Sequence, residues 1–465
     1  MISITAAELA EIFGSKVIGD SKSLVSAGTE TDSRLIAPGG LFFAKPGELN
    51  DGHDFVADAK AHGATVAIVE RQVDCDIAQI VVSDTVQALG TLAGWLITEL
   101  KNRGNLKVIG ITGSNGKTTT KNMLREILSK IGNTIAPIES FNNKVGAPIS
   151  ILRADLETKY LVVEMGAEGI GSISYLAKMA KPDIGVILKV GMAHAGEFGG
   201  IENTAKIKGE LAESLGENGK LVLNADDALV SAMKNRTKAE VSWFGTQPES
   251  DFSASEVTVS KLGTAFVLKW PDGEKTPVQL RILGEHHVMN ALAAASVSRL
   301  LGASKAQIVH SLESMELAER WRMQRAVRSD GVTVINDAYN ASPDSMRAAL
   351  QTLAQLGRMG SRTIAVLGEM AELGEYSRYE HDSIGRLVVR LNIDQLVVVG
   401  EGAKLIHMGA SQEGSWDGES QFFSSIAETL AYLRGILTDG DTVLVKSSKS
   451  ANLRFLGDEL MLEAE

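Results

Sequence analysis

The stretch LKVIGITGSNGKTT at residues 106–119 decides the fold, because an apolar strand runs into a glycine-rich turn and then into a helix. The glycines let backbone N–H groups turn toward a phosphate, and the start of the helix adds its positive end. Lys117 can neutralise phosphate charge, and Thr118 can bind Mg²⁺. The pattern therefore predicts a phosphate loop for ATP. Its residues are Gly113, Ser114, Asn115, Gly116, Lys117, Thr118 and Thr119.

The loop departs from the usual phosphate-loop spacing at one position. The strict pattern has a glycine five residues before Gly116, where this chain has Ile111. An ordinary glycine turn at the start of a helix is the alternative. The order of strand, turn, GKTT and helix favours the phosphate loop.

Strands and helices alternate along most of the chain, which predicts an α/β fold with mainly parallel sheets. Residues 1–84 are expected to form a small mixed α/β domain, with strands at 41–44 and 65–70. Residues 85–318 are expected to form a central P-loop-type ATPase domain with a mainly parallel sheet. The alternation restarts at 319–465, which predicts a C-terminal Rossmann-like α/β domain.

The composition excludes several classes of protein. Hydrophobic residues make up 44% of the 465 residues and charged residues 22%, the balance of a globular chain. The net charge of −12 argues against a nucleic-acid partner, which needs a basic face. Cys75 is the only cysteine, so no intramolecular disulfide can form, and neither a signal peptide nor a membrane span is visible. We therefore expect a cytoplasmic protein, with a monomer as the default state.

Further motifs are spread over the whole chain. They are TDSR at 31–34, FNNKVGAP at 141–148, VVEMGA at 162–167, GMAHAGEFGG at 191–200, NDAYNASPDSM at 336–346 and LGEMAELGE at 367–375. Together with TGSNGKTT, they resemble the Mur ligases, ATP-dependent enzymes that form amide bonds in peptidoglycan assembly. The last two motifs resemble the members that join D-alanyl-D-alanine to UDP-N-acetylmuramoyl-tripeptide.

The resemblance implies that ATP activates a peptide carboxylate as an acyl phosphate, which the amine of D-alanyl-D-alanine then attacks. Two anions must meet in such a site, so cations are needed between them. The resemblance implies two Mg²⁺ ions beside ATP. The implied catalytic residues are Lys117, Glu164, His194 and Lys208, and the implied metal ligands are Thr118, Glu164, His194 and Lys208.

The residues themselves leave alternatives open for three of these roles. Glu164 could be a solvated strand-end carboxylate, His194 a structural histidine and Lys208 a solvated surface lysine. The resemblance instead places Lys208 at the lysine that many Mur ligases carbamylate with CO₂. A carbamate is a carboxylate-like ligand and would suit the second Mg²⁺.

The same resemblance assigns ligand-binding residues outside the loop. Those implied for ATP are Asn290, which opens a helix, Arg322 and Asp337. Those implied for the substrates are Thr31, Asp32, Ser33, Arg34, Asn142, Asn143, Tyr339 and Asn340. Turn-capping polar residues are the alternative for the asparagines and for the TDSR segment.

The chain departs from the family pattern at four positions. His287 stands where the family usually has asparagine, which predicts that ATP binding becomes sensitive to pH below neutrality. Ser342 stands where asparagine is commoner, and Ser447 and Lys449 stand where glycine and arginine are commoner. Lysine cannot reproduce the bidentate fork of arginine, so the VKSSKS segment is given no role.

Two other functions remain as alternatives. A related ligase would add a single amino acid such as diaminopimelate or lysine, and a phosphate-loop switch or transport ATPase would join no substrates. Because the loop is in the second domain and Arg322 begins the third, we expect the third domain to swing toward the loop.

Overall fold

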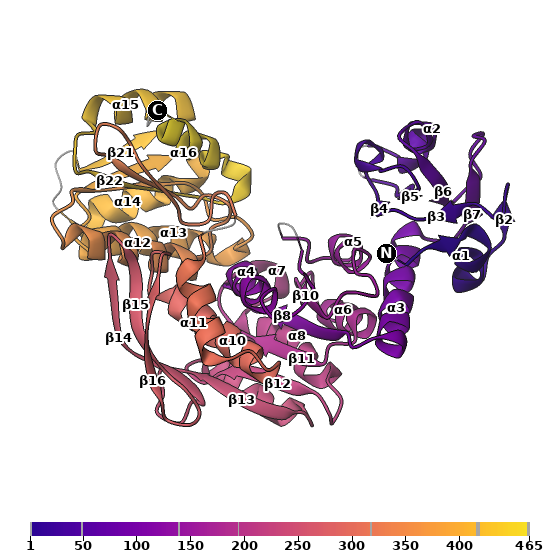
Figure 1. Ribbon diagram of the computed structural model, residues 1–465. Coiled ribbons are helices and arrows are strands. Elements are labelled where there is room, and N and C mark those ends of the chain that lie inside the picture. Colours follow the sequence, from indigo (N-terminus) through magenta and orange to yellow (C-terminus); the bar gives the residue numbers. More distant parts are fainter. Residues whose placement is uncertain are drawn as a thin grey trace.

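The computed structural model describes residues 2–47, 50–137, 140–193, 195–316, 319–414 and 419–462. These residues form three main sheets and one two-stranded pair. The sheets succeed one another across the molecule, with the N-terminal sheet at one end and the C-terminal sheet at the other (Figure 1). The expected fold class, three successive α/β units with mostly parallel sheets, is confirmed.

The N-terminal unit is built on a small mixed sheet in the order β2-β7-β6-β5-β4, in which β2 pairs antiparallel and the others parallel. The strands and helices are β1 (Ile4–Thr5), α1 (Ala6–Phe13), β2 (Val17–Ile18), β3 (Leu24–Val25), β4 (Thr29–Glu30), β5 (Gly40–Phe43), α2 (Val56–Ala61), β6 (Ala64–Val69) and β7 (Ala78–Val81), with the 3₁₀ turns η1 (Ser33–Leu35) and η2 (Gly52–Phe55). The two predicted strands correspond to β5 and β6.

Helix α3 (Thr85–Arg103) joins the N-terminal unit to the central one. Asp84 begins it by accepting hydrogen bonds from the N–H groups of Val86 and Gln87 at 2.8 and 2.9 Å. The helix packs against α1 on one side and against the central helices α5 and α6 on the other. One continuous apolar core therefore runs from the first unit through α3 into the second.

The central unit has a nine-stranded sheet in the order β16-β15-β14-β13-β12-β11-β8-β10-β9. Its strands are β8 (Lys107–Thr112), β9 (Thr134–Ile135), β10 (Tyr160–Glu164), β11 (Ile184–Ile187), β12 (Lys220–Asn224), β13 (Glu240–Gly245), β14 (Phe252–Ser260), β15 (Gly263–Lys269) and β16 (Lys275–Leu280). Its helices are α4 (Lys117–Leu128), α5 (Gly146–Ile151), α6 (Ser172–Ala180), α7 (Ala195–Phe198), α8 (Ile201–Ser214), α9 (Ala228–Ser231), α10 (His286–Leu300) and α11 (Lys305–Ser314), with the 3₁₀ turn η3 (Ala232–Arg236).

The central sheet ends in an antiparallel extension that the alternation of strands and helices does not reveal. Strands β8 to β14 pair parallel with one another, whereas β15 pairs antiparallel with both β14 and β16. Pro277 lies in β16, which is the edge strand, where a residue without an N–H group is tolerated.

The C-terminal unit has a six-stranded sheet in the order β17-β18-β22-β19-β20-β21, parallel except for β17. Its strands are β17 (Gln324–Val327), β18 (Thr333–Asn336), β19 (Thr363–Leu367), β20 (Gln395–Val399), β21 (Ser420–Phe423) and β22 (Thr442–Lys446). Its helices are α12 (Pro343–Gly357), α13 (Ser377–Arg390), α14 (Lys404–Glu413), α15 (Ile426–Ile436) and α16 (Leu453–Leu462), with the 3₁₀ turns η4 (Gly374–Tyr376), η5 (Glu401–Ala403) and η6 (Lys449–Ala451). Separate apolar clusters cover the two faces of this sheet, as a doubly wound sheet requires.

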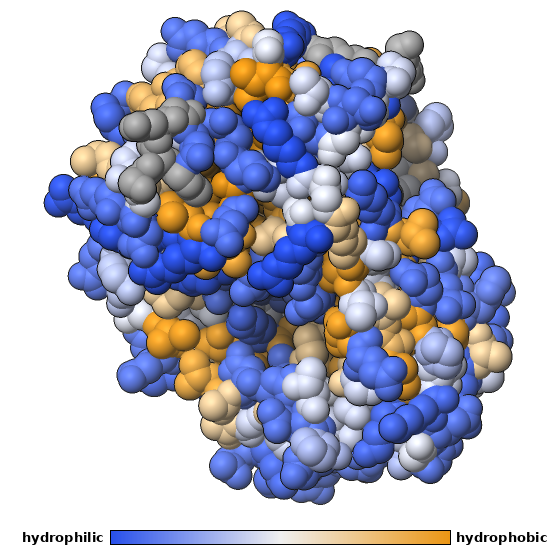
Figure 2. All heavy atoms as spheres, turned by 90° about the vertical axis from the view of Figure 1, so that its left-hand side faces the viewer, coloured by the Kyte–Doolittle hydropathy of each residue, from blue (hydrophilic) through white to orange (hydrophobic). Residues whose placement is uncertain are grey.

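The surface of the molecule is mixed in polarity. Figure 2 shows one face, on which hydrophilic side chains predominate and apolar ones form separate small patches. Among the described residues, no helix has the length and apolar character needed to cross a membrane.

Candidate active site

The phosphate loop lies between the carboxyl end of β8 and the start of α4. Gly116 has a φ of 87°, in the region that favours glycine, and a Cβ atom there would overlap the side-chain oxygen of Asn290. The hydroxyl of Ser114 donates to the carbonyl oxygen of Gly191 at 3.2 Å and accepts from its N–H at 2.9 Å. The loop is therefore fixed from two sides, by α10 and by the segment that follows β11.

The amine of Lys117 folds back onto the loop that it follows. It donates to the carbonyl oxygen of Gly113 at 2.7 Å. Loss of water around the amine lowers the pKa of Lys117, the nearby Glu164 opposes that shift, and Arg322 adds to it. Two cations from different units thus lie close enough to influence one another beside the loop.

Glu164 ends β10 beside the phosphate-loop strand, in register with Ile111. It is almost fully buried, and its two carboxylate oxygens have separate partners. One accepts from the hydroxyl of Thr118 at 3.1 Å, and the other accepts from the side-chain amide of Asn142 at 2.8 Å. A hydroxyl and a carboxylate at the loop are oxygen donors of the kind that Mg²⁺ prefers, so these residues fit the ion that the resemblance implies.

Lys208 lies on α8 and is 2% exposed, so the interpretation as a solvated lysine is wrong. Burial lowers the pKa of its amine well below the usual value, and the charge of Lys117 adds to the shift. A buried amine with a lowered pKa carries a lone pair that can react with CO₂. His194, the other implied metal ligand, lies outside the described residues.

Asn290 lies in the second turn of α10, which begins at His286, so the expectation that Asn290 opens the helix is wrong. Its side-chain oxygen accepts from the hydroxyl of Thr120 at 3.4 Å, and its amide lies 3.4 Å from Nδ1 of His287. The ring of His287 is buried and lies 4.0 Å from that of His286. Burial lowers the pKa of His287 well below its usual value.

The C-terminal residues expected to contact ATP surround Arg322. Its guanidinium lies 4.3 Å from the ring centre of Tyr339 and donates to the hydroxyl of Ser140 at 3.1 Å. Asp337 pairs with the amine of Lys446 at 2.6 Å and accepts from the N–H of Met323 at 3.0 Å. Arg322 therefore already reaches the central unit, while Asp337 is engaged within its own.

Several of the implied substrate residues form local turns. Asp32 begins the 3₁₀ turn η1 and pairs with Arg34 at 2.6 Å, and this pairing lowers the pKa of Asp32 to about 2. Asn143 accepts from two backbone N–H groups just ahead of it, at 3.1 and 2.9 Å. In the structure Asp32 and Asn143 therefore cap turns, which is the role that the alternative interpretation gives them.

The other implied substrate residues lie in two places. Thr31, Ser33 and their neighbours belong to the N-terminal unit, which stands apart from α4 (Figure 1). Asn340 is exposed, and its carbonyl oxygen accepts from Lys446 at 3.0 Å.

The start of α12 contacts the phosphate loop directly, which the sequence did not indicate. The hydroxyl of Ser342 donates to the side-chain oxygen of Asn115 at 3.2 Å. The carboxylate of Asp344 accepts from the N–H of Met192 at 3.0 Å and lies 3.4 Å from the amine of Lys189. Contacts across some 150 to 230 residues of chain leave no signal in local spacing, so sequence reasoning missed Asp344.

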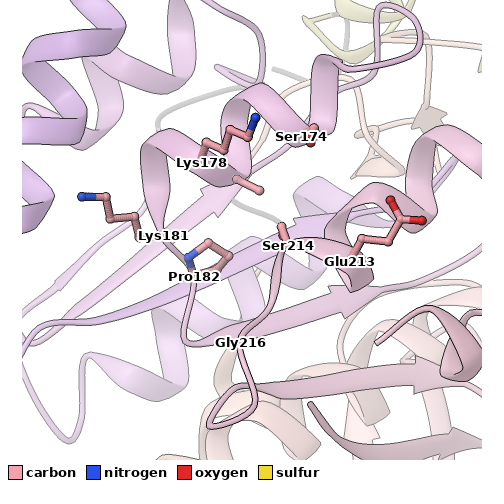
Figure 3. A pocket seen from close by; sticks show the side chains of 8 residues that line it. Ser174, Lys178, Lys181, Pro182, Glu213, Ser214 and Gly216 are labelled. Atoms are coloured by element: carbon pink, nitrogen blue, oxygen red, sulfur yellow. The ribbon is translucent and has the colours of Figure 1, made fainter. Parts of the chain in front are cut away.

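A separate hollow of about 450 Å³ lies between α6 and α8 (Figure 3). Its lining includes Ser174, Lys178 and Lys181 on one side and Glu213 and Ser214 on the other. Two of these charged groups are engaged elsewhere, since Lys181 donates to Thr98 at 2.6 Å and Glu213 pairs with Arg236 at 2.8 Å. Of the predicted site residues that the structure describes, none lines this hollow.

Comparison with known proteins agrees with this geometry. Residues 27–94 match the model of the Mur ligase family catalytic domain, residues 111–298 that of the Mur ligase middle domain, and residues 321–449 that of the Mur ligase glutamate ligase domain. The UDP-N-acetylmuramoyl-tripeptide–D-alanyl-D-alanine ligase of Mycobacterium tuberculosis is 42% identical over 504 residues, covering 100% of this chain and 98% of that protein.

Solved structures show the same likeness. MurF from Acinetobacter baumannii aligns with a TM-score of 0.89 and 33% identity, covering 99% of each chain. MurF from Thermotoga maritima in complex with ADP aligns with a TM-score of 0.82 and 27% identity, covering 95% of this chain and 98% of that one. Fold and loop define a nucleotide-binding α/β protein of three units. The chain belongs to the Mur ligase family.

Proposed function

We propose that this protein is an ATP-dependent ligase that joins D-alanyl-D-alanine to UDP-N-acetylmuramoyl-tripeptide in peptidoglycan precursor synthesis, giving the pentapeptide, ADP and phosphate. The observation that carries the proposal is the full-length likeness to ligases of that name, in a chain whose loop, Glu164 and Arg322 converge on one site. A cytoplasmic monomer is part of the proposal.

The three units take separate roles in this proposal. Residues 1–84 bind the uridine diphosphate end of the substrate through Thr31, Asp32, Ser33 and Arg34. Residues 85–318 bind ATP, and residues 319–465 close on it and bind D-alanyl-D-alanine, with Tyr339 and Asn340 in the dipeptide pocket. Asn142 and Asn143 face the peptide of the tripeptide substrate.

The chain's own groups account for the charge that must be held during the reaction. Loop N–H groups and Lys117 hold the β- and γ-phosphates, and Arg322 approaches them from the third unit, so the attacking carboxylate meets a site with positive charge. Asn290 contacts the adenine, and Asp337 orients the nucleotide from the third unit. Mg²⁺ bound by Thr118 and Glu164 would supply further charge neutralisation at the transferred phosphoryl group.

The second metal position involves Lys208 and His194. The buried amine of Lys208 is uncharged to a greater extent than an exposed lysine because burial lowers its pKa, and an uncharged amine is the form that reacts with CO₂. A carbamate there would turn a costly buried cation into an anionic oxygen ligand.

One assay separates this function from its rivals. The protein is supplied with UDP-N-acetylmuramoyl-tripeptide, ATP and Mg²⁺, and D-alanyl-D-alanine competes with single amino acids, D-alanine and diaminopimelate included. We expect the mass of the dipeptide product and ATP turnover that depends on the acceptor. Addition of a single amino acid without dipeptide product would favour a related ligase, and ATP turnover without any acceptor would favour an ATPase switch.

A further inference from the structure

A buried ion pair joins the phosphate-loop helix to the first residue described after the central unit. Lys121 lies on α4 one turn after Lys117, and its side chain is fully buried. Its amine pairs with Oε1 of Glu319 at 2.7 Å, and the amide of Asn122 donates to the same oxygen at 3.3 Å. One carboxylate oxygen of Glu319 is thus committed to α4.

The second carboxylate oxygen of Glu319 faces Arg322. Oε2 lies 3.3 Å from Nε of Arg322, whose guanidinium also reaches Ser140 at 3.1 Å. Ser140 lies 3.4 Å from the hydroxyl of Thr118. Glu319 therefore stands between the phosphate-loop helix and the one cation that the proposed function brings in from the third unit.

The backbone around Arg322 is held in an unusual conformation. Trp321 and Met323 have φ values of 64° and 50°, in the region that favours glycine. Hydrogen bonds fix both, since the N–H of Tyr339 donates to the carbonyl of Trp321 and that of Met323 donates to Asp337, each at 3.0 Å. The backbone on both sides of Arg322 is therefore fixed, and Glu319 meets the side chain at Nε through a charge contact and not a hydrogen bond.

We propose that Glu319, held by Lys121, is a positioning residue that fixes the Arg322 guanidinium against the phosphate loop. The inference rests on the proposed function only in taking Arg322 as an ATP contact. The Lys121–Glu319 pair then has a role beyond stability. An ion pair with Lys121 alone would need one carboxylate oxygen, whereas Glu319 divides its two oxygens between Lys121 on α4 and Arg322.

Breaking a buried pair and replacing it have different consequences for stability. Removing one partner leaves the other charge buried, which destabilises the fold strongly, whereas replacing both partners with apolar side chains is often neutral. Glu319→Gln and Lys121→Met break the pair, and the double variant Lys121→Met/Glu319→Met replaces it. Only a positioning role predicts that the double variant regains stability without regaining function.

The experiment measures the thermal midpoint, the affinity for ADP by calorimetry, and kcat and KM for ATP and for the tripeptide substrate. We expect the double variant to unfold at the wild-type temperature and to lose on the order of 100-fold in kcat/KM for ATP, the cost of a misplaced group. The KM for the tripeptide should not change, because Glu319 contacts no part of the N-terminal unit among the described residues.

Two exposed pairs provide matched controls. Lys130 lies two residues after the end of α4, and Lys130→Met removes an exposed partner of Glu126. Glu316→Gln removes an exposed partner of Arg281. Both controls should keep wild-type kinetics. Recovery of both stability and ATP kinetics in the double variant would overturn the proposal, as would wild-type kinetics in Glu319→Gln.

Failure of the proposed function gives a different result. If the wild-type protein makes no dipeptide product, the function is wrong, but ADP affinity across the variants still decides the role of Glu319. A tenfold or larger loss of ADP affinity in the double variant, with no loss in the two controls, supports positioning. Equal affinity in all variants overturns it.

Discussion

Lys208 is a single residue whose environment changes its chemistry. On sequence alone it is one of two lysines on its helix, and only the family resemblance singled it out. The structure adds a physical reason, because its amine is buried and its pKa is lowered well below the usual value. A charged lysine is costly in such a place, and a carbamate with a bound cation would remove that cost.

We predict that Lys208→Ala and Lys208→Arg both lose about 10²–10³ in turnover, the usual cost of removing one charge-stabilising group. Arginine keeps the positive charge but cannot form the same carbamate, so it should not substitute. Added acetate should partly restore Lys208→Ala by supplying the missing carboxylate. The control is Lys206→Ala, an exposed lysine of the same helix, which should turn over normally. Near-normal activity in Lys208→Arg would reject the carbamate.

His287 shows how burial can reverse an expectation drawn from the residue type at one position. The sequence suggested that ATP binding would change below neutrality, where a free histidine titrates. Burial lowers the pKa of His287 well below its usual value, and the neighbouring His286 adds to that shift. The ring therefore stays neutral as the pH falls through neutrality.

We now predict that the KM for ATP is flat from about pH 6 to pH 8 in the wild type and in His287→Asn, apart from groups common to both. A neutral imidazole and an amide each offer a donor and an acceptor, and neither changes its charge over this pH range. The two curves should therefore run parallel. The measurement is the KM for ATP against pH for both proteins. A rise near pH 6.5 confined to the wild type would mean that the ring titrates after all.

The functional residues near a recognisable motif could be predicted from the sequence, and those whose role depends on contacts between distant parts of the chain could not. Lys117 and Thr118 begin a helix and Glu164 ends a strand, positions where such chemistry is expected, and the three lie together in the structure. Lys121 and Glu319 are 198 positions apart and carry no local pattern. Their roles come from packing, which spacing along the chain cannot report.

Helices α13 and α14 pack closely in the C-terminal unit through a glycine. A Cβ atom at Gly385 would overlap the backbone of Ile406 and come within 2.8 Å of the N–H nitrogen of Ala410. The absence of a side chain at this position therefore sets how closely the two helices approach.

We predict that Gly385→Ala lowers the free energy of unfolding by about 1–3 kcal/mol, because backbone cannot move aside as a side chain can. The matched control is Gly435→Ala on α15, where a Cβ atom meets nothing within 4 Å. Alanine there should raise the free energy of unfolding by about 0.5–1 kcal/mol through helix propensity alone. Denaturant titrations of the two variants should shift in opposite directions, and equal shifts would contradict the packing argument.

The LGEMAELGE segment is held by a buried histidine of the following helix. Nε2 of His381 accepts from the N–H of Met370 at 3.0 Å, and Nδ1 donates to the carbonyl of Ser377 at 2.7 Å. This pattern requires the neutral ring. Burial lowers the pKa of His381, while the hydrogen bond to Ser377 and the charges of Glu369 and Glu380 oppose that shift.

A histidine whose pKa is lowered by folding stabilises the fold fully above the unfolded pKa of about 6.5, and this contribution is lost as the pH falls below that value. We predict that His381→Leu removes part of this pH dependence and costs about 1–3 kcal/mol at neutral pH through the lost hydrogen bonds. The measurement is the thermal midpoint at about pH 5.5 and pH 7.5. The exposed His62→Gln serves as control, and identical pH dependence in wild type and His381→Leu would contradict the prediction.

Elements with the βα alternation were predictable, and those without it were not. Strand β8, which precedes α4, was predicted because a buried parallel strand reads as an apolar run. Strands β14 to β16 carry mixed polar residues and a proline at the sheet edge, so their sequence resembles loop as much as strand. Only pairing with neighbours makes them a sheet.

The relation between the three units was the least predictable feature of the whole molecule. The third unit was expected to swing toward the loop, and in the structure it already contacts the central unit. Arg322 reaches Ser140, Ser342 reaches Asn115, and Asp344 reaches Met192. The contact between Ser342 and Asn115 lies on the phosphate loop itself.

We therefore predict that the nucleotide-free protein samples more open arrangements than the one described, and that ATP analogue with tripeptide substrate makes it more compact. Interfaces between units of one chain are usually mobile. The three contacts named are hydrogen bonds, and Val259 and Leu283 of the central unit pack on the apolar cluster of the third unit. Replacing Cys75 with serine leaves no native thiol. Spin labels at engineered cysteines replacing Lys130 and Gly435 then report one distance between the turn that follows α4 and helix α15. The distance distribution should be broad without ligand and should narrow and shorten with it, in step with a smaller radius of gyration in solution scattering. An unchanged, narrow distribution in both states would mean that the third unit is fixed on the central one and that nucleotide enters without domain movement.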